Sequence, residues 1–119
     1  MAVKPFEATI RHQASQAIID LRGDIDASAE AALNAAYVEA ETHQPENILL
    51  NFTEVEYINS TGIALIVGLL AKARQAHLPL HTCGLSDHYV EIFQITRLSD
   101  FMMIYPDEAS ALANGSEAE

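Results

Sequence analysis

The chain has 119 residues, half of them hydrophobic, which is enough for one compact domain with a single core. Its formal net charge of −11 argues against nucleic acid and anionic membranes as partners and favours a protein that carries a basic patch. The single cysteine, Cys83, excludes an internal disulfide framework and fits a reducing cytoplasm.

The first part of the chain predicts a β-hairpin followed by a helix. Residues Phe6–Gln13 and Gln16–Arg22 have the pattern of two strands joined near Ala14 and Ser15. The segment Gly23–Asp26 breaks that pattern, and Asp26 or Ser28 can cap the next helix. Apolar residues then recur at three- and four-residue steps along one helix face, which ends before Pro45: Ala29, Leu33, Ala36, Tyr37 and Ala40.

The middle of the chain predicts a strand, a tight turn and an unusually apolar helix. Residues Asn47–Phe52 are mostly apolar, as expected of a strand that is covered on both faces. Residues Thr53–Asn59 are expected to turn the chain, and Ser60 opens the helix. A serine there has its hydroxyl beside backbone N–H groups that lack helical acceptors, so a phosphate would be held by those groups and by the helix dipole.

The last part predicts two more strands and two more helices. Residues Leu78–Gly84 and Met102–Tyr105 have strand character. Ser86 caps a helix that extends to about Thr96, with Val90, Phe93 and Ile92 or Ile95 on its inner face, and Pro106 begins the final helix. The expected fold is therefore α/β: a mixed central sheet of about five strands, the N-terminal hairpin and then parallel strands, with about four helices.

Residues 1–113 are expected to form this one domain, and residues 114–119 to be a disordered polar tail. The N-terminus lacks the apolar core of a signal peptide, and the longest apolar stretch, Gly62–Ala71, is too short to span a bilayer. We therefore expect a cytoplasmic domain that contacts no membrane.

Loops at the carboxyl ends of parallel strands share one rim of a sheet. Three loops are expected there: Gly23–Asp26, Thr53–Thr61 and Gly84–Asp87. This arrangement places Ser60 beside Asp24 and Asp26.

Helical spacing predicts a docking face that begins at Ser60. Four residues should face the sheet, namely Ile63, Ile66, Val67 and Leu70. The opposite side would then expose an apolar, flat strip formed by Leu65, Gly68 and Leu69. The competing interpretation is that another part of this chain covers Leu65 and Leu69.

Charge is unevenly distributed around Ser60. No acidic residue occurs from Asn59 to Ser86, whereas eight acids and no lysine or arginine occur from Gly23 to Ile58. A phosphate on Ser60 would add about −1.5 to −2 charges and disturb a docked partner without refolding the domain.

The segment Tyr57–Ile63, between a buried strand and an apolar helix, resembles the phosphorylation loop of STAS domains, the family of anti-sigma factor antagonists and of domains in sulfate transporters. The similarity extends over most of the chain, from Phe6 to Leu112. Gly23–Asp26 is similar to the family's turn before the first helix. A C-terminal pattern is also similar: Val90, Phe93, Thr96, Leu98, Phe101, Ile104, Tyr105, Asp107 and Glu108.

The resemblance implies a binding protein rather than an enzyme, with no cofactor and no metal. The implied partner is an anti-sigma factor that is often also a serine kinase; it would phosphorylate Ser60 and be released, and a metal-dependent PPM-type serine phosphatase would reverse the modification. Asn59 and Thr61 would shape the loop, and Gly62 would let a partner approach the backbone. The partner-binding surface would comprise Asp24, Asp26, Ile63, Leu65, Gly68 and Leu69.

Two positions depart from the family pattern. Asn59 stands where aspartate is familiar; it can still cap the helix but carries no charge. Arg97 stands where the family often has a glycine that ends the third helix, so Arg97 would have to adopt a left-handed conformation at a modest cost.

Several alternatives remain open on the residues alone. A serine hydrolase would need a Gly-x-Ser-x-Gly elbow, but position 58 is isoleucine, and His88 is the nearest rim histidine. His81 and Cys83 form at most half of a metal site, and a nucleotide site would lack the phosphate-loop lysine. Ser60 could also be a plain helix cap, or the domain could be an unswitched scaffold subunit that holds a partner such as the ATPase of a lipid transporter.

Overall fold

Five strands form one mixed sheet in the order β1-β2-β3-β4-β5. The computed structural model describes residues 4–117, with side chains for residues 4–113. The strands are β1 (Glu7–Gln13), β2 (Gln16–Ile25), β3 (Asn47–Ile58), β4 (Leu80–Cys83) and β5 (Ile104–Tyr105). The helices are α1 (Glu30–Thr42), α2 (Ser60–Gln75), α3 (Asp87–Ile95) and α4 (Glu108–Glu117), and short 3₁₀ turns occupy Ala27–Ala29 and Leu98–Asp100.

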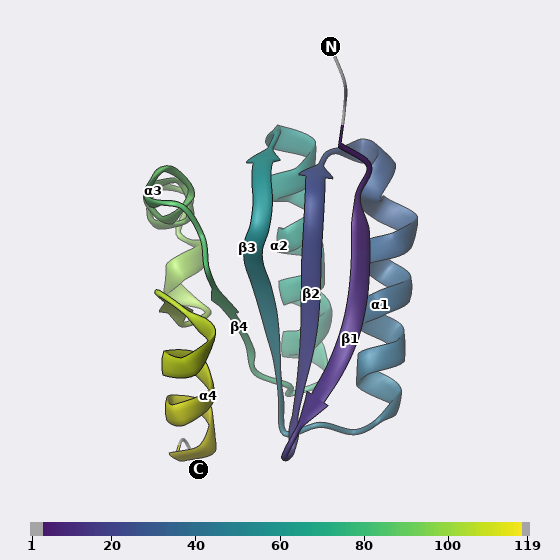
Figure 1. Cartoon of the computed structure of the whole chain (residues 1–119), viewed down its shortest axis with the longest axis vertical. Coiled ribbons are helices and arrows are strands. Elements are labelled where there is room, and N and C mark those ends of the chain that lie inside the picture. Colours follow the sequence, from purple (N-terminus) through teal and green to yellow (C-terminus); the bar gives the residue numbers. More distant parts are fainter. Residues whose placement is uncertain (1–3, 118–119) are drawn as a thin grey trace.

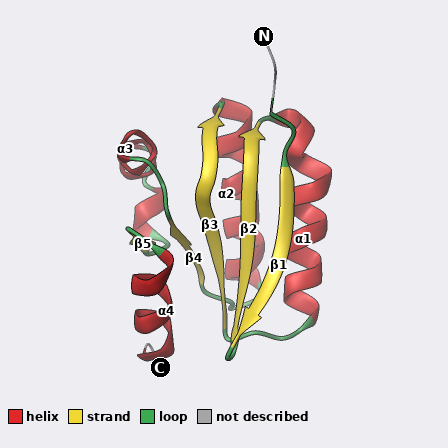
Figure 2. Ribbon diagram, in the orientation of Figure 1, coloured by secondary structure: helices red, strands yellow, loops and turns green. Residues whose placement is uncertain are grey.

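The first two strands form an antiparallel hairpin, and every other neighbouring pair is parallel. The arrowheads of β2 and β3 therefore lie at the same end of the molecule, and α2 begins at that end (Figure 1). The predicted fold class is confirmed, including the N-terminal hairpin and the parallel strands that follow it (Figure 2).

Helices cover the two faces of the sheet unequally. Side chains alternate between the faces of a strand, so Ile19 and Leu50 belong to the main core with α1 and α2, while Ile18 and Leu49 face the other way. The second group packs with Ala111 of α4. The predicted inner helix face is confirmed, because all five of its residues are buried: Ala29 in the 3₁₀ turn and Leu33, Ala36, Tyr37 and Ala40 in α1.

The expected turn at Thr53–Asn59 is wrong, because β3 continues without a break to Ile58. Its extension pairs with the end of β2, which runs through the predicted break to Ile25, and Ile25 lies opposite Ile58. The pairing register shifts twice, between Asp20 and Arg22 and between Gly23 and Asp24. At each shift β3 contains one residue more than the β2 segment opposite it. The extended β2–β3 ribbon carries Ser60 beyond the end of the short strand β4.

The last part of the chain agrees with expectation in some details and differs in others. Of the two candidates for the inner face of α3, Ile92 packs against the core and Ile95 is exposed, and Tyr89 joins Phe93 on that face. Arg97 adopts the expected left-handed conformation, with φ of 69°. Helix α4 reaches into the predicted tail of residues 114–119, whose last two residues lie outside the described part of the chain.

Candidate partner-binding site

Ser60 is the first residue of α2, and its side chain is exposed. The residue before it, Asn59, caps the helix: its Oδ1 accepts a hydrogen bond of 2.8 Å from the N–H of Gly62. The cap therefore uses the asparagine oxygen and leaves the Ser60 hydroxyl available. The predicted helix start is confirmed, and the interpretation of Ser60 as the cap itself is wrong.

The first turn of α2 has spare hydrogen-bond donors. Within residues 4–117, the backbone N–H groups of Ser60 and Thr61 have no acceptor. Two such donors at the positive end of a helix dipole stabilise an anion. Thr61 was expected to shape a loop, but it is an exposed residue inside the helix.

Two contacts fix this turn to the rest of the domain. The N–H of Asn59 donates to the carbonyl oxygen of Ile25 at 3.1 Å, and the N–H of Ile58 donates to the phenolic oxygen of Tyr89 at 2.8 Å. The end of β2 and the first turn of α3 thus anchor the residues immediately before Ser60. Sequence reasoning missed Tyr89, because no local pattern signals a hydrogen bond between residues this far apart in the chain.

Gly62 has a structural role that differs from the predicted one. It is buried, and a Cβ at this position would lie 2.2 Å from the carbonyl oxygen of Ile25 and 2.9 Å from a methyl group of Ile58. Glycine is needed so that the first turn of α2 can pack on the ends of β2 and β3. It does not provide an opening for a partner.

The exposed side of α2 is rotated relative to the expected docking strip. Leu69 is 1% exposed and belongs to the core, so its assignment to the partner-binding surface is wrong. Val67 was expected to face the sheet, but it is 45% exposed. Ile63 and Leu65 are half-buried against the core. We define the outer face of α2 as the exposed residues of this helix from Ser60 to Ala71, which are Ser60, Thr61, Ala64, Val67, Gly68 and Ala71.

The outer face of α2 consists of residues with small side chains, and none of them is acidic. A Cβ added to Gly68 would meet nothing within 4 Å, so no part of the described chain covers this position. The competing interpretation, that this chain itself covers Leu65 and Leu69, is confirmed for Leu69 and holds in part for Leu65, whereas Gly68 is uncovered. An uncovered, nearly flat and weakly polar helix face suits contact with another protein.

The acidic residues of the rim lie close to the start of α2. Asp24 pairs in register with Tyr57, and its carboxylate accepts from the N–H of Lys4 at 3.4 Å. Asp26 caps the turn that follows β2, and hydrogen bonds from the Ser28 hydroxyl and N–H lower the pKa of the Asp26 carboxyl. The structure thus brings Asp24 and Asp26 to the same end of the sheet as Ser60.

The third predicted rim loop lies farther from Ser60 than expected. β4 ends at Cys83, which pairs with Asn51, whereas β3 continues to Ile58. Gly84 consequently packs beside Thr53. The parallel strands have unequal lengths, so their carboxyl ends are not level.

The candidate metal ligands have other partners. Nδ1 of His81 accepts the N–H of Met103 at 3.2 Å, and the Cys83 thiol lies 3.6 Å from Oδ1 of Asn51. Burial raises the pKa of the Cys83 thiol to about 11, which disfavours the thiolate that a metal requires. In the described part of the chain, no group of three or more histidine, cysteine or acidic residues could hold a metal ion.

Known proteins resemble this chain in sequence and in fold. The family model of the STAS domain matches residues 6–111. The chain belongs to the STAS domain family. An anti-sigma-B factor antagonist of Listeria monocytogenes is 33% identical to this STAS domain over 100 residues, which cover 84% of the chain and 86% of the relative.

Solved structures share the fold of this STAS domain at low sequence identity. An anti-sigma factor antagonist from Mycobacterium paratuberculosis has a TM-score of 0.81 at 16% identity and covers 94% of this chain and 95% of its own. The Bacillus cell fate determinant SpoIIAA in its phosphorylated form has a TM-score of 0.69 at 20% identity, and the match covers 92% of this chain and 98% of SpoIIAA.

None of the helices described for this STAS domain is long and apolar enough to cross a membrane.

Proposed function

We propose that this STAS domain is an anti-sigma factor antagonist: it binds an anti-sigma factor through the outer face of α2, and phosphorylation of Ser60 ends that binding. The partner is then a serine kinase as well as a ligand, and a PPM-type phosphatase restores the serine. The domain acts in the cytoplasm as a substrate and a binding protein, not as a catalyst.

The exposure of Ser60 at the start of the outer face is the observation that carries this proposal. The hydroxyl is accessible, because Asn59 rather than Ser60 caps the helix. Ser60 also belongs to the same exposed surface as Ala64, Val67 and Gly68. A modification of the hydroxyl therefore changes the surface that a docked partner would contact.

The local charge explains why a phosphate would release the partner without unfolding the domain. The unpaired N–H groups of Ser60 and Thr61 accommodate the new charge within the protein. The same charge adds to the field of Asp24, Asp26 and Glu56 at this end of the sheet. A partner that fits the bare serine would have to bury an added dianion, which is unfavourable.

The relatives are consistent with this role. The Listeria relative is named an anti-sigma-B factor antagonist, and a structural neighbour, SpoIIAA, is described in a phosphorylated form. The neutral Asn59 favours a second candidate function, an unswitched scaffold subunit that holds a partner such as a transporter ATPase, because it adds no charge for a kinase to recognise.

A binding assay with the anti-sigma factor of the source organism tests the switch. Incubation with that protein and ATP should add one phosphate, which mass spectrometry maps to Ser60. Ser60→Asp should weaken binding at least about ten-fold, and Ser60→Ala should not. Ser15→Asp adds the same charge in the exposed β1–β2 turn and should leave binding unchanged. Equal binding by wild type and Ser60→Asp would refute the switch and favour the scaffold.

A second pair of variants tests the surface independently of the modification. Val67 on α2 and Val38 on α1 are exposed to similar extents, 45% and 52%. Val67→Asp should abolish partner binding, because it places a charge in the middle of the outer face, whereas Val38→Asp should have no effect. If Val38→Asp were the harmful change, the partner would dock on α1 and the proposed surface would be wrong.

A further inference from the structure

A groove lies between the second half of α2 and Phe101, which follows the 3₁₀ turn Leu98–Asp100, and it adjoins the far end of the outer face of α2 at Val67 and Ala71. Two adjoining hollows share Leu70, Arg74 and Phe101. The first has a volume of about 280 Å³ and is also walled by Pro79 and Leu80. The second extends over Val67 and is lined mainly by apolar atoms.

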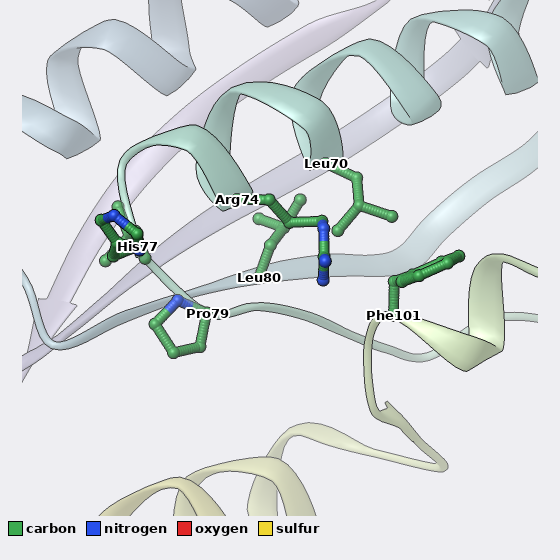
Figure 3. A pocket seen from close by; sticks show the side chains of 7 residues that line it. Leu70, Arg74, His77, Pro79, Leu80 and Phe101 are labelled. Atoms are coloured by element: carbon green, nitrogen blue, oxygen red, sulfur yellow. The ribbon is translucent and has the colours of Figure 1, made fainter.

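Arg74 lines both hollows and lies beside Phe101. Its guanidinium carbon lies 4.8 Å from the centre of the Phe101 ring (Figure 3). A guanidinium held over an aromatic ring by a cation–π contact keeps N–H donors available for a planar acceptor such as a carboxylate. Phe101 itself is 52% exposed, so its ring also offers apolar contact area to a bound ligand.

The charge of this groove is unusual in such an acidic chain. The protein has 17 acidic and 6 basic residues, and four of the basic ones form ion pairs with carboxylates in the described part: Lys4, Arg11, Arg22 and Arg97. The two that do not are Lys72, which donates to Asn34, and Arg74. Both lie in the second half of α2.

The carboxylate of Asp100, next to Phe101 in the chain, pairs with Arg97 and not with Arg74. It accepts a hydrogen bond of 2.6 Å from Nε of Arg97. The described chain therefore leaves the guanidinium of Arg74 without a carboxylate partner beside an exposed apolar surface. A ligand that complements both features must carry an acidic group next to an apolar one.

We propose that this groove binds a segment of a partner protein in which a carboxylate side chain is adjacent to an aliphatic or aromatic one. The carboxylate would bind Arg74, and the apolar side chain would pack against Phe101, Leu70 and Val67. The groove is open along the helix, so it suits a peptide segment better than a small molecule, which needs an enclosing pocket. Arg74, which is specific to the groove, lies about 20 Å from Ser60 along the axis of α2, whereas Val67 is shared with the outer face.

Selection of short random peptides displayed on phage against the full-length protein tests this proposal. The selected peptides should be enriched in aspartate or glutamate next to large apolar residues. Synthetic copies, measured by fluorescence anisotropy, should bind at least about ten-fold more weakly to Arg74→Gln and to Phe101→Ala than to wild type. Arg22→Gln is the matched control, since Arg22 is an exposed arginine on β2, and it should leave the affinity unchanged.

Three outcomes would overturn the proposal. Selection could yield no binding peptide, or peptides without acidic residues, or peptides whose affinity is the same for wild type and Arg74→Gln. Analytical ultracentrifugation adds a fourth: a wild-type dimer that Arg74→Gln and Phe101→Ala dissociate would show that the groove holds a second copy of this chain instead.

Discussion

The backbone N–H of Ile58 donates a hydrogen bond of 2.8 Å to the phenolic oxygen of Tyr89. Ile58 is the last residue of β3, two positions before Ser60, and Tyr89 lies in the first turn of α3. This bond occurs where β3 has already passed the end of β4, so a tyrosine side chain replaces the missing neighbouring strand.

Removal of the phenolic oxygen should therefore destabilise the domain. Tyr89→Phe leaves the buried N–H of Ile58 without its acceptor, and the free energy of unfolding should fall by about 1–3 kcal/mol in urea denaturation. Tyr57→Phe is the matched control, because Tyr57 is exposed, and it should change stability by less than about 0.5 kcal/mol. Equal effects of the two variants would mean that the Tyr89 bond contributes nothing.

The two glycines of α2 should respond in opposite ways to alanine. Gly62→Ala places a methyl group against the carbonyl oxygen of Ile25, and we expect a loss of about 1–3 kcal/mol. Gly68→Ala adds a methyl group in open space and should raise stability by about 0.5–1 kcal/mol, because alanine favours the helix. Thermal and urea denaturation of the two variants measure both signs; stabilisation by Gly62→Ala would contradict the packing described for that turn.

The cap of α2 should depend on the side-chain oxygen at position 59. Asn59→Ala removes the acceptor for the N–H of Gly62 and should cost about 0.5–2 kcal/mol. Asn59→Asp keeps an oxygen there and adds a negative charge at the positive end of the helix, so it should be as stable as wild type or more stable. Urea denaturation distinguishes the two, and an Asn59→Ala variant as stable as wild type would show that the cap is dispensable.

Acidification should weaken the fold through His81. Burial lowers the pKa of His81, and its Nδ1 accepts the N–H of Met103, which a protonated ring cannot do. As pH falls below the unfolded value of about 6.5, the unfolded state binds the proton first, so this contribution is complete above that pH and is lost below it.

His81→Asn tests this effect, because the asparagine oxygen can accept the same bond but does not titrate. Its free energy of unfolding should change less than that of wild type between about pH 7.5 and about pH 5.5. His88→Asn replaces an exposed histidine and should behave like wild type. An equal loss in wild type and His81→Asn would assign the acid sensitivity to other groups.

Local patterns in the sequence were sufficient to predict the order of the elements and the start of α2. Asn59 and Ser86 cap helices through bonds to residues three positions ahead, so short segments carry that information. The hairpin turn at Ala14 and Ser15 and the helix end before Pro45 are local in the same sense. The exposed hydroxyl of Ser60 follows from its place after a capping asparagine.

The tertiary structure alone decided which side of α2 is exposed and how far β3 extends. Residues 63–71 are apolar around the whole helix, so hydrophobic spacing could not distinguish Val67 from Leu69; contact of Gly62 with the end of β2 sets the rotation. The extension of β3 required β2 as a partner, although Gly23 looked like a break. These features depend on contacts between residues far apart in the chain, which no local pattern records.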